Sequence, residues 1–76
     1  MKSAINIERD MKVQDNVLNF ILENMPHGGY STIGKKLNME RRHVRDEILI
    51  RKTAYNKDII ENCLQLVEFA TGKKPE

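Results

Sequence analysis

The amino-acid sequence predicts an all-α fold in which four helices form one small domain. Apolar residues recur at the three- and four-residue spacing of amphipathic helices. Prolines, glycines and capping residues separate these apolar stretches. The 76 residues leave room for a single domain, and a hydrophobic content of 39% is sufficient for a core.

The first helix is expected between Lys12 and Met25. Its apolar residues follow the stripe of a helix that buries one face: Val13, Val17, Phe20, Ile21 and Met25. One proline and two glycines within residues 26–29 end this helix, because proline restricts the residue before it and glycine favours loop conformations.

Two short helices are expected in the middle of the chain. Ser31 is the predicted N-cap of the second helix. Asn38 ends that helix, because asparagine tolerates the left-handed backbone conformation that closes a helix. A third helix follows after a short turn. The residues expected to point inward are Ile33 and Leu37 in the second helix and Val44 and Ile48 in the third.

The last helix is expected from about Asn56 to Thr71, with Gly72 closing it. One side of this helix is apolar: Ile59, Ile60, Cys63, Leu64, Val67 and Ala70. The predicted domain therefore spans residues 12–72, with an N-terminal extension over residues 1–11 and a flexible tail over residues 73–76.

Composition argues against membrane and secreted proteins. No run approaches the roughly 18 to 20 apolar residues of a membrane-spanning helix, and residues 1–10 lack the apolar stretch of a secretory signal. The single Cys63 cannot form an internal disulfide. We therefore expect a cytoplasmic protein.

The positive charge is concentrated in the middle third of the chain. Residues 30–52 carry seven basic and three acidic side chains, a net charge of +4, whereas residues 1–29 and 53–76 each carry −1. A local basic patch raises the concentration of anionic ligands around it. This distribution predicts an anionic partner.

The middle helices have the spacing of a helix-turn-helix. Counted from Tyr30, Gly34 is fifth and Asn38 ninth. Two helices that cross steeply need a small residue where their backbones approach and a permissive residue in the turn. Gly34 and Asn38 meet these two requirements.

Residues 17–70, with the motif YSTIGKKLNMERRHVRDEI, resemble small bacterial and phage regulators with DNA-binding domains of the lambda-repressor and lac-repressor type. The resemblance implies a four-helix helix-turn-helix domain whose third helix enters the major groove of double-stranded DNA. It further implies a transcriptional regulator of phage or mobile-element origin. The sequence departs from the family pattern at Gly34, Asn38 and Glu40, where alanine, glycine and a capping serine or threonine are usual. Glu40 is a weak N-cap and would repel phosphate.

A recognition helix presents its N-terminal and outer-face residues to base edges. The candidate base-reading residues are therefore Arg41, Arg42, Arg45 and Asp46. Arginine can contact guanine through two hydrogen bonds, and a carboxylate can accept one from cytosine. The resemblance matches Arg41, Arg42 and Asp46 to base-reading positions and matches His43 and Arg45 to flanking or phosphate-facing positions.

Phosphate contacts are expected near the N-terminus of the second helix, where free N–H groups and the helix dipole favour an anion. The candidate phosphate-binding residues are Tyr30, Ser31, Thr32, Lys35, Lys36 and His43. Simpler interpretations remain open. The arginines could form a solvated face with an Arg42–Asp46 ion pair, Lys35 and Lys36 could be merely solvated, and Tyr30 could cover the helix crossing.

Catalysis and metal binding are not indicated. His27, His43 and Cys63 show no ligand spacing, and no carboxylate pair or phosphate-binding loop stands out. We expect no enzymatic activity, no cofactor and no metal, and the sequence gives no evidence of a small-molecule effector. His27 is expected to serve the turn or to touch phosphate. Cys63 is expected in the core.

One small module touches few base pairs, so a homodimer that binds two half-sites is expected. Leu66, Phe69 and Ile50 could form its interface, or they could instead cover the underside of the first helix. Within residues 1–11, Ile5 and Ile7 could form a strand across a two-fold axis, or the segment could be frayed or add a helical turn. An alternative function is a protein-interaction module, an adaptor or antitoxin-like partner, on the same scaffold without DNA binding.

Overall fold

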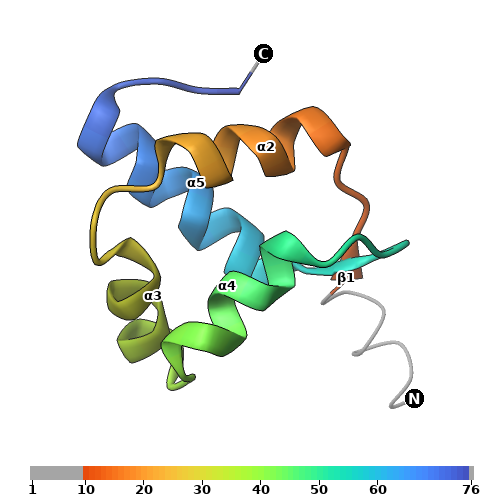
Figure 1. Ribbon diagram of the computed structural model, residues 1–76, viewed down its shortest axis with the longest axis horizontal. Helices are drawn as coiled ribbons and strands as arrows, with labels where there is room; N and C mark the ends of the chain where they lie inside the picture. The colour runs from red at the N-terminus through yellow and green to blue at the C-terminus, as the bar shows by residue number, and fades with distance from the viewer. Residues whose placement is uncertain (1–9, 76) are drawn as a thin grey trace.

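Figure 1 shows the computed structural model of the protein, in which residues 10–75 are described. This part of the chain is mostly helical, as the sequence predicts, with α2 (Asp15–Asn24), α3 (Gly29–Leu37), α4 (Arg41–Leu49) and α5 (Lys57–Thr71). Two short strands, β1 (Asp10–Met11) and β2 (Tyr55–Asn56), pair with each other. Helix α5 contacts the other three helices and so lies at the centre of the packing (Figure 1).

The core consists of side chains from every helix and from β2. Its buried members are Leu18, Ile21, Ile33, Val44, Ile48, Tyr55, Ile59, Ile60 and Cys63. Most of these are the residues that helical spacing predicts to point inward, and the prediction for Cys63 is confirmed. The predicted stripe of the last helix extends too far, because Ala70 is exposed whereas Val67 is buried. The last turn of α5 therefore projects beyond the core.

Helices α3 and α4 meet through a very close backbone contact. A Cβ atom added at Gly34 would lie 2.6 Å from the carbonyl oxygen of Met39. Asn38 has the left-handed conformation, with φ at 61°, and its N–H and that of Met39 both donate to the Gly34 carbonyl oxygen. The predicted roles of Gly34 and Asn38 are confirmed. Glu40 precedes α4 in extended conformation and makes no side-chain capping bond, in agreement with its weak capping ability.

Two predicted helix starts are wrong. The first helix begins at Asp15 rather than Lys12, because Asp10 and Met11 pair with β2 and the N-cap residue Gln14 still has an extended backbone. The second begins at Gly29, so Ser31 lies inside its first turn and is not its N-cap. Gly28 takes that position with φ at 79°, a conformation that glycine adopts easily.

The ribbon of β1 and β2 was not predicted from the sequence. Met11 pairs with Tyr55 in antiparallel register, which joins the segment before α2 to the segment before α5. The end of the predicted N-terminal extension is thus a strand that pairs within the chain. Ile5 and Ile7, the candidates for a strand between two copies, lie outside the described residues.

Helix α5 has the boundaries that the sequence predicts. The side-chain oxygen of Asn56 accepts a hydrogen bond from the N–H of Ile59 at 3.2 Å, which satisfies one of the free donors at the start of the helix. Gly72 closes the other end with φ at 76°. The prediction for Gly72 is confirmed, and the N-cap role of Asn56 is an additional finding of the structure.

Glu47 joins α4 to the start of α5. One of its carboxylate oxygens lies 2.6 Å from Nζ of Lys52, and the other accepts the backbone N–H of Asn56 at 2.7 Å. Burial alone would raise the pKa of Glu47, but the hydrogen bonds from Lys52 and Asn56 outweigh it and lower this pKa below its usual value. The carboxylate is therefore stabilised in its charged form.

We expect Glu47 to make folding stability depend on pH. Since the pKa of Glu47 is lower in the folded than in the unfolded chain, its contribution is fully present above the unfolded value of 4.5 and is lost as the pH falls through the folded pKa. The variant Glu47→Gln should lose roughly 1 kcal/mol at neutral pH and should flatten this part of the acid profile. Urea unfolding between neutral and acidic pH measures both effects.

The matched control is Glu61→Gln, because Glu61 forms only an exposed pair with Lys57 at 4.0 Å. This change should leave the acid profile unaltered. Equal profiles for Glu47→Gln and the unsubstituted chain would contradict the role of Glu47.

Candidate functional site

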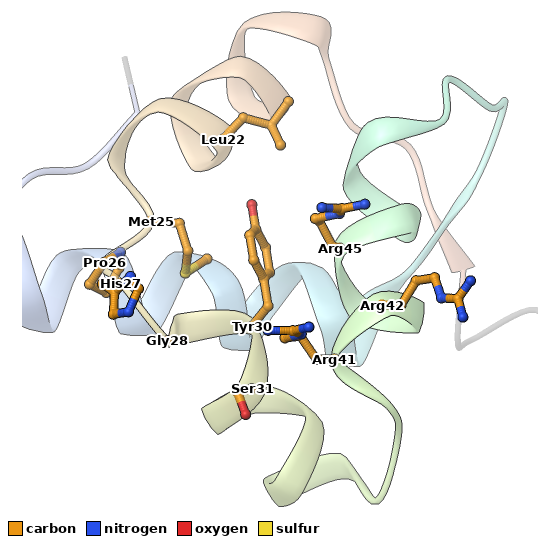
Figure 2. A pocket seen from close by; sticks show the side chains of 10 residues that line it. All are labelled: Leu22, Met25, Pro26, His27, Gly28, Tyr30, Ser31, Arg41, Arg42 and Arg45. Atoms are coloured by element: carbon orange, nitrogen blue, oxygen red, sulfur yellow. The ribbon is translucent and has the colours of Figure 1, made fainter.

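A hollow of about 670 Å³ opens between the end of α2, the start of α3 and the outer face of α4 (Figure 2). Each of the three helices contributes side chains to it. The lining residues are Leu22, Met25, Pro26, His27, Gly28, Tyr30, Ser31, Arg41, Arg42 and Arg45. The hollow thus brings together five of the candidate base- and phosphate-binding residues, Tyr30, Ser31, Arg41, Arg42 and Arg45, with His27 beside them.

The three arginines line the hollow because of how α4 packs. Val44 and Ile48 are fully buried, and they fix the inner face of the helix. The helical period then turns Arg41, Arg42 and Arg45 outward, and all three are exposed. Figure 2 shows all three on α4, with Arg41 and Arg45 on the side toward Tyr30 and the Arg42 side chain extending away from Tyr30.

No acidic side chain neutralises these arginines within the described part of the chain. The ion pairs formed there join Arg51 to Asp15, Lys52 to Glu47, Lys57 to Glu61 and Lys74 to Glu68. The alternative of an Arg42–Asp46 pair is therefore wrong for this structure. Asp46 lines a separate, smaller hollow beside His43 and Glu47. Three unpaired guanidinium groups make the larger hollow strongly attractive to anions.

Tyr30 stands within the hollow with its hydroxyl end toward Leu22 and Arg45 (Figure 2). The hydroxyl oxygen is buried and has no hydrogen-bond partner among the described residues. Burial raises the pKa of Tyr30, as does the nearby Cys63 sulfur, while Arg45 acts in the opposite direction. The phenol accordingly keeps its proton at neutral pH and can donate it to an acceptor.

The start of α3 adds backbone donors. Gly28 provides no side-chain cap, and the first N–H groups of a helix have no acceptor within the helix. The N–H of Gly29 donates to Pro26 and that of Thr32 donates to Gly28, at 2.9 and 3.0 Å. The N–H groups of Tyr30 and Ser31, which line the hollow, remain for an anion.

The other predicted phosphate-binding residues lie elsewhere. The Thr32 hydroxyl donates to the Gly28 carbonyl oxygen at 3.1 Å, and Thr32 and Lys36 line a small hollow against α5. His43 shares the hollow of Asp46, and Lys35 is exposed on α3. The structure therefore groups the arginines with Tyr30 and Ser31 and separates them from Thr32, Lys36, His43 and Asp46.

Sequence reasoning missed the apolar wall of the hollow. Leu22, Met25 and Pro26 form it together at the end of α2. Met25 and Pro26 were assigned only to the first helix and its termination. His27 is exposed in the turn and also lines the hollow. A proline and two glycines directly after an amphipathic helix are a signal for such an exposed turn.

Three further features concern metal binding, thiol reactivity and membrane spanning. Within residues 10–75, no three His, Cys, Asp or Glu side chains are grouped so as to hold a metal ion. Cys63 is fully buried, and burial raises its pKa to about 12, so its sulfur stays protonated. None of the helices in the described range has the length and apolar character needed to cross a membrane.

The chain was also compared with known proteins. Neither the protein-family models, nor the curated proteins, nor the solved structures contain a match to it.

Proposed function

We propose that the protein binds double-stranded DNA, with α3 and α4 as a helix-turn-helix of the lambda-repressor and lac-repressor type. The single observation that carries this proposal is the set of three exposed, unpaired arginines on the outer face of α4, next to the uncapped start of α3. Helix α4 would enter the major groove, and the N–H groups of α3 would contact phosphate. Sequence-specific binding of this kind serves regulation of transcription.

The geometry of the crossing supports this arrangement. Gly34 and Asn38 allow α3 and α4 to approach until backbone atoms nearly touch, so the first turns of both helices border the same hollow. A duplex placed against this face would meet Arg41 and Arg42 at the start of α4 and Arg45 one turn later. Asp46, on the adjoining side, would meet a neighbouring base.

The phosphate contacts divide into two groups under this proposal. Tyr30 and Ser31 line the hollow with the arginines and would together contact one stretch of the DNA backbone. Thr32 and Lys36 face the α5 side, and Lys35 and His43 lie outside the hollow. The lysines would therefore contribute general attraction that weakens as salt rises, rather than a fixed contact.

Two copies of the chain would bind two half-sites about one helical turn apart. Phe69 is 89% exposed and Ile50 57% exposed, so both are available to a second copy. Leu66 packs partly against the core and contributes less free surface than the sequence suggests. Gel filtration with light scattering, with and without the selected duplex, determines this stoichiometry.

The proposal is tested by selecting bound fragments from random duplex DNA and measuring affinities by fluorescence anisotropy across a salt series. Arg42→Gln should weaken binding to the selected duplex by about 1–3 kcal/mol and relax base preference at one position. Lys35→Gln should instead weaken binding to all duplexes similarly and reduce the salt slope by about one.

Lys73→Gln is the matched control, because it removes one positive charge from the tail after α5, which Figure 1 shows beyond α2, away from α3 and α4. It should leave affinity and preference nearly unchanged. If no sequence is enriched and Arg42→Gln behaves like Lys73→Gln, the proposal is overturned. The protein-interaction module then becomes the better hypothesis.

A further inference from the structure

The hollow beside the arginines has features that a DNA backbone would not use. Its wall on the α2 side is apolar and consists of Leu22, Met25 and Pro26. A phosphodiester chain is charged and hydrated, so it gains little from contact with such a wall. The wall is suited to the apolar part of a ligand.

The size of the hollow also points to a small ligand. Its volume of about 670 Å³ lies within the range of roughly 300 to 1,000 Å³ found for small-molecule sites. Such sites combine a mainly apolar lining with a few convergent polar groups. Here the polar groups are donors and cations: the Tyr30 hydroxyl, the N–H groups of Tyr30 and Ser31, and the guanidinium groups.

We propose that this hollow binds a small amphipathic anion, with an aromatic or branched apolar body and one carboxylate or phosphate head group. The apolar body would contact Leu22, Met25 and Pro26. Arg41 and Arg45 would bind the head group, because a guanidinium group can offer two parallel hydrogen bonds to either anion. Under the proposed function the same arginines contact DNA. If that function holds, the bound anion competes with the duplex.

Tyr30 provides an independent observation. A buried hydroxyl without a hydrogen-bond partner costs free energy, and removing it should therefore stabilise the protein. The hydroxyl lies beside the exposed Arg45, so it would donate to the head group of the ligand once the Arg45 side chain turns to bind that head group. Tyr30→Phe should thus raise the midpoint of thermal unfolding and yet weaken ligand binding. A purely structural role for this hydroxyl would not give that combination.

The direct test uses the full chain and probes of defined chemistry. Naphthoate and naphthyl phosphate carry an apolar body with one anionic head group. Naphthamide keeps the body without the charge, and acetate and inorganic phosphate keep the charge without the body. We expect the first two probes to shift the amide NMR signals of residues 22–31 and 41–45. Their affinities, from calorimetry, should exceed those of the last three by about tenfold or more.

The preferred head group identifies the source of the natural ligand: tighter naphthoate binding indicates an organic acid, and tighter naphthyl phosphate binding indicates a phosphate monoester. Arg45→Gln should weaken either probe about tenfold. Lys73→Gln removes a charge of the same sign from the exposed tail after α5 and should leave probe affinity unchanged. Equal affinities for naphthoate and naphthamide, or equal effects of these two variants, would overturn the proposal.

Competition is measured by adding the tighter probe to a chain already bound to its selected duplex. If the probe shifts the NMR signals of the hollow while the chain binds no duplex, the ligand site stands and the proposed DNA binding fails. If the chain binds duplex but no probe shifts these signals, the DNA-binding proposal stands and the ligand site is wrong. Displacement of the duplex by the probe at matching concentrations would support both.

Discussion

Replacing Gly34 with alanine is expected to lower the free energy of unfolding by about 1–3 kcal/mol, and valine at this position is expected to prevent folding. At most positions inside a helix the same change to alanine stabilises a protein by up to about 1 kcal/mol. At Gly34 the new Cβ atom would lie 2.6 Å from the Met39 carbonyl oxygen and 3.4 Å from the Arg41 amide nitrogen. Both are backbone atoms, so α4 itself must move. Urea unfolding followed by circular dichroism measures the loss.

Gly29→Ala is the matched control at the other end of α3. Its new Cβ atom would meet the flexible side chain of Met25 and a methyl group of Leu66 at 3.1 Å, and these can shift. The loss should therefore be smaller than at Gly34. A gain in stability from Gly34→Ala would contradict the close crossing and would remove the geometric support for DNA binding.

Replacing Tyr55 with alanine is expected to cost about 3–5 kcal/mol. Tyr55 is only 2% exposed, pairs with Met11 in the ribbon and accepts the N–H of Lys52 at 2.8 Å through its hydroxyl. The ring thereby anchors the loop between α4 and α5 to the core. Since a chain of 76 residues has a total stability of only about 4–11 kcal/mol, this change should leave the fold close to unfolding.

Two further variants separate the contributions of Tyr55. Tyr55→Phe keeps the ring and should cost only about 1 kcal/mol, for the lost hydrogen bond from Lys52. Phe69→Ala removes an aromatic ring that is 89% exposed and should change stability by less than about 0.5 kcal/mol. Thermal unfolding of the three variants gives the comparison. Similar losses for Tyr55→Ala and Phe69→Ala would show that the burial of Tyr55 does not stabilise the fold.

The helices could be predicted because their determinants are local in sequence. Val44 and Ile48 repeat at the helical period, and Asn38 and Asn56 carry side chains suited to helix ends. The ribbon could not be predicted, since two-residue strands show no periodic pattern and the pairing of Met11 with Tyr55 depends on how distant helices pack. The early start of α3 depends on the backbone freedom of Gly28. The sequence favoured Ser31 instead, because serine is a common N-cap residue.

Only the α4 side of the candidate site could be predicted from the sequence. The outward position of Arg41, Arg42 and Arg45 follows from the period of α4 once its buried face is known. The wall formed by Leu22 and Met25 depends on the packing of α2 beside α3 and α4, which sequence spacing does not specify. For the same reason the sequence grouped Lys36 with Tyr30 and Ser31 as phosphate contacts, although Lys36 faces the side of α5.

The buried sulfur on α5 provides a built-in reporter of conformational opening. Cys63 is the chain's single cysteine, has no solvent exposure and stays protonated, so alkylating reagents reach a reactive thiolate only when the helix leaves its neighbours. The rate of alkylation therefore follows the population of open molecules, without any added label. The same holds for protein bound to a partner. A ligand that binds only the closed form therefore slows alkylation by the factor 1 + L/Kd, where L is the free ligand concentration.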